Sequence, residues 1–249
     1  MFVRDAGNAS GPVLLFIHGG GVAGWMWDAQ TVRFGSRYRL LVPDLPGHDR
    51  SCDIPFTSSG AVVAEFAALL RTLPAGTDVT VIGFSLGAQI ALELASSHPE
   101  LVTRAVVTSA LTQGMPLPGL SNWLVGVAAP LARQAWFARL QAKSLFIPDG
   151  LLDDYLRTSA SLPAESLVAL TRANAEFRAP RTWQDFPGPA LLLAGAKEPG
   201  VLLRGMEQLS RDNSRSELVI HDGAGHGLPL QHPERFSEQV DQWLAEHTG

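Results

Sequence analysis

The sequence is poor in cysteine, in charge and in long apolar runs. Its 249 residues include one cysteine, Cys52, which excludes an internal disulfide and a cysteine-based metal cage. Only 17% are charged, and the 19 Lys and Arg are outnumbered by 24 Asp and Glu without forming a basic run, which argues against nucleic acid as a partner. The longest wholly apolar run, residues 123–132, is far shorter than the roughly 20 residues of a membrane-spanning helix. We therefore expect neither a nucleic-acid partner nor a transmembrane segment.

A secretory signal has a charged head followed by an apolar stretch, and the first ten residues lack this pattern. Together with the single cysteine, this predicts a reducing, cytoplasmic location. The chain does have 46% hydrophobic residues, 24 Gly and 17 Pro, a composition typical of a globular protein. No internal repeat or linker divides it, so we expect one α/β domain over residues 1–249.

Short apolar runs alternate with longer stretches of helical periodicity. The runs are residues 13–17, 40–42, 79–82, 105–107, 190–193 and 218–220. Such runs are typical of strands that are buried on both faces of a parallel sheet. Apolar residues recur at helical spacing within residues 62–73 and 236–244, and Pro233 suits the first turn of the second helix. Phe2 and Val3 are a candidate edge strand. The pattern predicts an α/β fold, a mostly parallel central sheet with helices on both faces.

One segment breaks this alternation. Residues 111–180 contain no strand-like run, and prolines separate several helix-like pieces, so we interpret the segment as an inserted helical cap. Residues 105–132 contain no Asp, Glu, Lys, Arg or His, which is unusual for a surface insertion. We expect Met115 and Trp123 within it to line an apolar substrate pocket. The alternative, that this stretch only packs on the sheet, accounts for its first few residues.

A serine between two glycines follows one of the predicted strands. Residues 83–87, Gly-Phe-Ser-Leu-Gly, come after the run at 79–82 and lead into a helical stretch. In such a strand–turn–helix the small neighbours let strand and helix approach closely, and the serine hydroxyl projects above the sheet. We therefore predict that Ser85 is a nucleophile. The alternative is a serine in an ordinary glycine-rich turn.

A glycine-rich turn also follows the first buried run. Residues 18–21, His-Gly-Gly-Gly, can direct a backbone N–H into a cavity, as stabilisation of a developing oxyanion requires. We expect the amides of Gly20 and Leu86 to supply this oxyanion hole. A simple chain reversal is the alternative, and a phosphate-binding loop is disfavoured because no GxxxxGK[ST] pattern is present.

With these motifs, the sequence resembles the α/β-hydrolase superfamily, in its compact branch of single-domain esterases. The resemblance covers nearly the whole chain. Its motifs are residues 13–21, 42–48, 83–87 and 223–229. The resemblance implies an α/β-hydrolase fold and a catalytic triad in the chain order nucleophile, acid, histidine, in which His226 occupies the position of the general base.

The acid departs from the usual pattern of the superfamily. After the run at 190–193 the family usually has Gly-x-x-Asp, whereas this chain has Glu198 at that position. A carboxylate there orients the imidazole and stabilises the imidazolium, and Glu can do so if the backbone lies about one methylene further back. Other members carry the acid at the end of the preceding strand, but residues 108–114 contain no Asp or Glu. The alternatives are a surface role for Glu198 and, as a weaker candidate acid, Asp222.

Three further residues are expected at the substrate pocket: Gly21, Trp25 and Phe84. Trp25 follows the glycine-rich turn closely, and packing is its alternative role. Asp44 is expected to organise the loop after its strand, in which Asp49 replaces a glycine that is usual in the family.

The resulting expectation is a serine hydrolase that cleaves a small, mainly apolar ester without a metal or an organic cofactor. A nucleophile other than serine would be needed for dehalogenase or epoxide hydrolase chemistry. Three uses of the same residues stay open: carbon–carbon bond hydrolysis, lyase chemistry and cofactor-free perhydrolysis. A different class is a ligand sensor without turnover, which a Glu198 that fails to reach His226 would favour.

Overall fold

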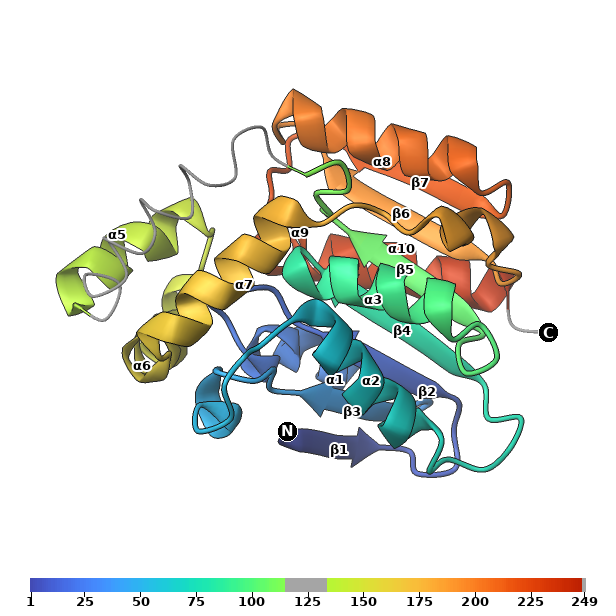
Figure 1. Cartoon of the computed structure of the whole chain (residues 1–249), viewed down its shortest axis with the longest axis horizontal. Coiled ribbons are helices and arrows are strands. Elements are labelled where there is room, and N and C mark those ends of the chain that lie inside the picture. Colours follow the sequence, from blue (N-terminus) through green and yellow to red (C-terminus); the bar gives the residue numbers. More distant parts are fainter. Residues whose placement is uncertain (115–133, 248–249) are drawn as a thin grey trace.

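The central feature of the computed structural model is a seven-stranded sheet (Figure 1). The structure describes residues 1–114 and 134–247. The strands are β1 (Val3–Gly7), β2 (Val13–Ile17), β3 (Arg39–Pro43), β4 (Val79–Phe84), β5 (Arg104–Thr108), β6 (Ala190–Gly195) and β7 (Ser216–His221). Their spatial order is β1-β3-β2-β4-β5-β6-β7, and only β1, the edge strand expected at Phe2 and Val3, is antiparallel to its neighbour. All six buried runs are strands of this sheet, which confirms the predicted α/β architecture.

Helices connect the strands and cover the sheet. They are α1 (Asp28–Phe34), α2 (Ser59–Leu70), α3 (Leu86–Ser97), α5 (Ala135–Ser144), α6 (Leu152–Ser161), α7 (Ala164–Glu176), α8 (Gly200–Asp212), α9 (Leu228–Gln231) and α10 (Pro233–Glu246). Short 3-10 turns are η1 (Gly24–Trp27), η2 (Asp49–Ser51), η3 (Asp149–Leu151) and η4 (Arg181–Asp185). Pro233 is the first residue of α10, where its missing N–H removes no helical hydrogen bond.

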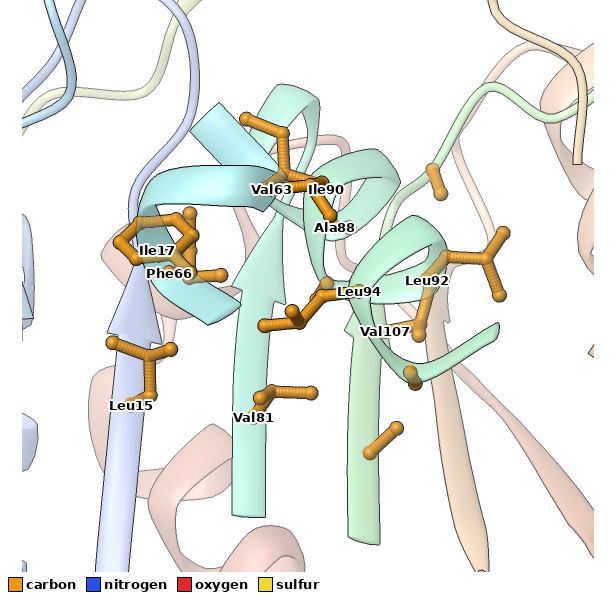
Figure 2. Packing of buried hydrophobic residues seen from close by; sticks show 14 of the residues in the cluster. Leu15, Ile17, Val63, Phe66, Val81, Ala88, Ile90, Leu92, Leu94 and Val107 are labelled. Carbon is orange, nitrogen blue, oxygen red and sulfur yellow. The ribbon is translucent and has the colours of Figure 1, made fainter. Parts of the chain in front are cut away.

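The alternation of side chains along each strand divides the core into two layers. Leu15, Ile17 and Val81 point to one face and belong to the core layer that includes α2 and α3, as Figure 2 shows; α8 covers β6 and β7 on the same face. Leu14 and Phe16 point to the other face and pack against α1 and α10. The central strands β2, β4, β5 and β6 are buried along their whole length. Burial on both faces explains their apolar runs, whereas the edge strand β7 is partly exposed.

The chain between β5 and β6 forms no strand in its described part. Helices α5, α6 and α7 lie at the edge of the sheet where the parallel strands end, on the left of Figure 1. Two buried hydrogen bonds join this part to the rest: the Trp25 indole N–H donates to the Thr158 hydroxyl at 3.0 Å, and the Phe56 amide donates to the Ser166 hydroxyl at 3.2 Å. This edge of the sheet thus faces helices instead of open solvent.

Candidate active site

The topology brings the predicted site residues to one edge of the sheet. Along the chain, β3 is added on one side of β2, and β4 is added on the other. The strand order therefore reverses between β2 and β4, and open α/β sheets bind ligands beyond the carboxyl ends of the strands at such a point. The loop after β2 holds Gly20 and Gly21, and Ser85 directly follows β4. Glu198 follows β6, and His226 follows β7.

Ser85 occupies a strained turn between β4 and α3. Its φ is 54°, in a region that non-glycine residues rarely adopt. The flanking glycines make the turn possible: a Cβ on Gly83 would lie 2.3 Å from the Gly87 carbonyl oxygen, and one on Gly87 would lie 2.2 Å from the Ile17 carbonyl oxygen. The Thr108 carbonyl oxygen accepts the Ser85 amide at 2.9 Å. Backbone contacts from two sides thus fix the conformation that presents the hydroxyl.

The imidazole of His226 joins Ser85 to Glu198. Its Nε2 lies 3.0 Å from the Ser85 Oγ, and its Nδ1 lies 2.8 Å from the Glu198 Oε2. The Glu198 carboxylate is fully buried, whereas the imidazole is 35% exposed. Because an ionised carboxylate only accepts hydrogen bonds, Nδ1 carries the proton, and Nε2 is left as the acceptor for the serine hydroxyl. Asp222, the weaker candidate acid, has an exposed side chain, and its carbonyl oxygen accepts from Arg235.

The two residues expected to form the oxyanion hole are neighbours. A Cβ on Gly20 would lie 3.7 Å from the Leu86 Cδ2, and Leu86 directly follows Ser85. Within the described ranges, neither the Gly20 nor the Leu86 amide has a hydrogen-bond acceptor. Leu86 is also the first residue of α3, where the helix dipole favours negative charge. Both amides are thus without an acceptor inside the described protein.

Two buried histidines shape the loop after β2. The His48 Nε2 accepts the Gly21 amide at 3.1 Å, and the His18 Nε2 accepts the Leu45 amide at 2.8 Å. The other ring nitrogen of each faces a carbonyl oxygen, of Pro46 and of Gly19, so each ring is a neutral Nδ1–H tautomer. Burial lowers the pKa of His48 to about 4, and it holds the pKa of His18 well below the usual range. Both imidazoles are therefore structural at neutral pH.

The loop after β3 also supports this region. The Asp44 Oδ1 accepts the Gly24 amide at 2.8 Å, and burial raises the pKa of this carboxyl. Asp49 has a φ of 39°, so it adopts the glycine-like conformation that its position requires. Its carboxylate accepts from Arg157 of α6 at 3.2 Å.

A cavity of about 190 Å³ adjoins the Gly20 and Gly21 backbone. Its other described lining residues are Gln141, Leu145, Tyr155, Ser159, Leu162, Leu167, Leu170 and Thr171. All of them come from α5, α6, α7 and the segments between these helices. None of the described lining residues is charged. The cavity is thus suited to a neutral group of modest size.

The other predicted pocket residues do not all lie at the same place in the structure. Phe84 lies at the site, where its ring is 5.3 Å from the His226 ring. Trp25 is buried and lines a different, polar pocket that includes Arg4 and Asp28, so it is not among the described residues of the 190 Å³ cavity. Met115 and Trp123 lie outside the described residues.

Two contacts at the site carry no signal in the sequence. The Ser109 hydroxyl donates to the Glu198 Oε1 at 2.6 Å, although a serine after a strand belongs to no motif. Phe146, with a φ of 59°, packs on the loop that holds His226: a Cβ on Gly227 would lie 2.9 Å from the Phe146 Cβ. The glycines at 225 and 227 could have indicated that another segment approaches this loop closely.

Neither a metal-binding cluster nor a membrane-spanning helix occurs in the described part of the chain. Among residues 1–114 and 134–247, no His, Cys, Asp and Glu side chains gather in a group of three or more that could hold a metal ion. None of the helices in these ranges has the length and apolar character needed to cross a bilayer.

Comparisons with known proteins bear on the family and the fold of the chain. A family model described as the alpha/beta hydrolase family matches residues 14–239. An AB hydrolase superfamily protein of Gibberella zeae is 30% identical over 246 residues, which cover 95% of this chain and 81% of that protein. A pimeloyl-[acyl-carrier protein] methyl ester esterase of Aromatoleum aromaticum is 30% identical over 250 residues, which cover 90% of this chain and 94% of the relative. A thermophilic esterase from Thermogutta terrifontis superposes with a TM-score of 0.80 at 22% identity, over 99% of this chain and 94% of that one.

Proposed function

The chain belongs to the α/β-hydrolase family, and from this membership we propose that it is a serine hydrolase that cleaves a small, mainly apolar carboxylic ester. The observation that carries the proposal is the hydrogen-bonded series from the Ser85 hydroxyl through the His226 imidazole to the Glu198 carboxylate. Curated relatives include an esterase that covers 90% of this chain, which supports hydrolysis of an ester.

The first half of the reaction transfers the acyl group to Ser85. The Ser85 Oγ attacks the ester carbonyl carbon while the His226 Nε2 takes the hydroxyl proton. The carbonyl oxygen becomes an anion that accepts hydrogen bonds from the Gly20 and Leu86 amides. When the tetrahedral intermediate collapses, the C–O bond to the alcohol breaks, and the imidazolium returns the proton to the leaving oxygen. Glu198 stabilises the imidazolium throughout.

The second half regenerates the enzyme. A water molecule gives a proton to the His226 Nε2 as its oxygen attacks the acyl carbon, and the same two amides hold the second oxyanion. Collapse breaks the bond to the Ser85 Oγ, which takes the proton back from the imidazolium. The products are one carboxylic acid and one alcohol for each ester and water consumed.

The 190 Å³ cavity supports a neutral, mainly apolar acyl group. Leu162, Leu167 and Leu170 give it an apolar wall, and the described lining has no cation that would pair with a carboxylate or phosphate. We assign α5, α6 and α7, within the segment 111–180, as a cap over this cavity. The cytoplasmic location stays a prediction from the single cysteine.

A glutamate that does not reach the imidazole would favour the ligand-sensor alternative. The 2.8 Å distance between the Glu198 Oε2 and the His226 Nδ1 takes away that support and favours turnover. Ligand binding without ester turnover by the purified protein would favour the sensor.

Turnover of p-nitrophenyl esters of increasing acyl length by the purified protein tests the proposal. We expect hydrolysis of short acyl chains and a mass shift on the Ser85 peptide after treatment with a fluorophosphonate. An unmodified Ser85 peptide, under conditions that label a control esterase, would contradict the assignment of the nucleophile.

A further inference from the structure

Ser109 lies directly after β5 in a conformation that serine rarely adopts. Its φ is 59°, in the left-handed region, and the residue is 1% exposed. A non-glycine residue is strained in this region, and such a conformation persists only where the surroundings fix it. Such residues cluster at functional sites, so the side chain that this conformation directs is of interest.

The Ser109 hydroxyl donates to the Glu198 Oε1 at 2.6 Å. The Gly195 amide donates to the same oxygen at 3.1 Å. The other carboxylate oxygen, Oε2, faces the His226 Nδ1 at 2.8 Å. The two oxygens therefore have separate partners: two donors hold Oε1, and Oε2 is left for the imidazole.

Backbone hydrogen bonds hold the segment around Ser109 between the nucleophile and the acid. Its amide donates to the Leu193 carbonyl oxygen at 2.8 Å, which ties it to the strand that leads to Glu198. The residue before it, Thr108, accepts the Ser85 amide through its carbonyl oxygen at 2.9 Å. One short segment thus contacts both the nucleophile turn and the buried acid.

A glutamate needs such support more than an aspartate does. It has one more side-chain torsion, and holding a longer side chain in a single rotamer costs more conformational entropy. The Gly195 amide fixes Oε1 from one direction only. A second donor from β5 limits rotation of the carboxylate and keeps Oε2 directed at the imidazole.

We propose that Ser109 is a positioning residue that orients Glu198 toward His226 and so compensates for the additional methylene of the glutamate. This inference rests on the proposed hydrolase function, because its kinetic consequence appears in ester turnover. Ser109 does not touch the reacting atoms and acts only through the carboxylate.

The test removes the hydroxyl in two ways. Ser109→Ala keeps the β-carbon, and Ser109→Gly also relieves the left-handed strain, so the glycine variant is expected to be at least as stable as the alanine variant. We expect kcat for a p-nitrophenyl ester to fall roughly tenfold in both, the loss typical of one hydrogen bond to a charged group, with KM unchanged. If both variants keep the kcat of the wild type, the proposal is overturned.

Ser96→Ala is the matched control. It also removes a buried serine hydroxyl, but near the C-terminal end of α3, and within the described part of the chain that hydroxyl has no hydrogen-bond partner. We expect its kcat to stay within about twofold of wild type. A loss as large as that of Ser109→Ala would show that removal of any buried hydroxyl lowers turnover and would contradict the proposal.

A spectroscopic measurement separates this inference from the hydrolase function. We expect the proton between the His226 Nδ1 and the Glu198 Oε2 to give a downfield ¹H NMR resonance in the resting protein, without substrate. This resonance should move in Ser109→Ala and stay in place in Ser96→Ala. An unmoved resonance overturns the positioning role even if esters are cleaved. A moved resonance with no ester turnover by the wild type supports the positioning role and rejects the hydrolase.

A Glu198→Gln background completes the test. If Ser109 acts through the carboxylate, adding Ser109→Ala to Glu198→Gln lowers kcat by less than twofold, because the group it positions is already altered. A further tenfold loss in the double variant would show that Ser109 acts by another route.

Discussion

The His226 Nε2 lies 3.0 Å from the Ser85 Oγ, although 141 residues separate them in the chain. Parallel register creates this proximity: Ile17 pairs with Gly83, and Gly195 pairs with His221, so the loops that follow these strands emerge at one edge. The contacts among Ser85, His226 and Glu198 therefore depend on the pairing of strands across the sheet. Replacement of the Ser85, His226 or Glu198 side chain is expected to affect the reaction before it affects the fold.

Removing either end of this contact should abolish turnover to the same extent. We expect Ser85→Ala and His226→Ala each to lower kcat by about a thousandfold or more, and the double variant to lose little beyond either one, because the two side chains act as a unit. His98→Ala is the control, since its ring lies near the surface beside Glu100. Multiplicative losses in the double variant would contradict a shared step.

Glu198 and Asp222 are the two candidates for the acid that pairs with His226, and replacing each by its isosteric amide distinguishes them. Glu198→Gln is expected to lower kcat by roughly a thousandfold, because the amide cannot stabilise the imidazolium and can present a donor to Nδ1. Asp222→Asn is expected to leave kcat within about twofold, since the Asp222 side chain is exposed. Steady-state kinetics with one p-nitrophenyl ester decides between them, and a larger effect at Asp222 would make it the acid.

The strands and the candidate relay could be predicted from the sequence because each has a local signal. Burial on both faces makes a parallel strand an apolar run, and the turn around Ser85 requires glycines at fixed positions. His226 and Glu198 are predicted by the resemblance to the α/β-hydrolases, which places the base and the acid after particular strands, and the structure brings the two side chains together.

The contacts between distant segments had no such signal. Ser109 reaches Glu198 only because β5 and β6 are neighbours, and a single serine after a strand is too common to indicate this. Trp25 follows the glycine-rich turn, but its indole donates to Thr158 and lines another pocket. Which side chains line a cavity depends on how the helices between β5 and β6 meet the sheet, and spacing along the chain does not determine this.

The glycines of the Ser85 turn should be required for folding. A Cβ on Gly83 would lie 2.3 Å from the Gly87 carbonyl oxygen, so Gly83→Ala is expected to lower the free energy of unfolding by about 3 kcal/mol or to prevent expression of folded protein. Gly150→Ala is the matched control, since a Cβ there has no neighbour within 4 Å. Urea unfolding measures both, and a tolerated Gly83→Ala would show that the turn is less tightly packed than described.

Acid should destabilise the protein through His48. Burial lowers its pKa from 6.5 to about 4, so between these values the unfolded chain binds a proton that the folded chain does not. The free energy of unfolding therefore falls as the pH is lowered from 6.5 to 4, by up to roughly 3 kcal/mol from this residue, and is fully retained above 6.5. His18 contributes in the same direction.

Urea unfolding at a series of pH values tests this, with His48→Gln as the comparison. Glutamine can accept the Gly21 amide but does not titrate, so its curve should be shallower across the same interval. Parallel curves for the two proteins would show that another group causes the acid sensitivity.

The size of the residue at position 170 should set the preferred acyl length. Leu170 is buried on α7 and lines the cavity, and its Cδ1 lies 3.1 Å from where a Cβ on Gly20 would be. Leu170→Ala is expected to shift the maximum of kcat/KM toward longer acyl chains, and Leu170→Phe toward acetyl, each changing the ratio of long to short esters by roughly tenfold. Leu140→Ala is the control, since this residue is 61% exposed on α5 and does not line the cavity. If both variants stay folded by circular dichroism and neither changes the dependence of kcat/KM on acyl length, the acyl group binds elsewhere.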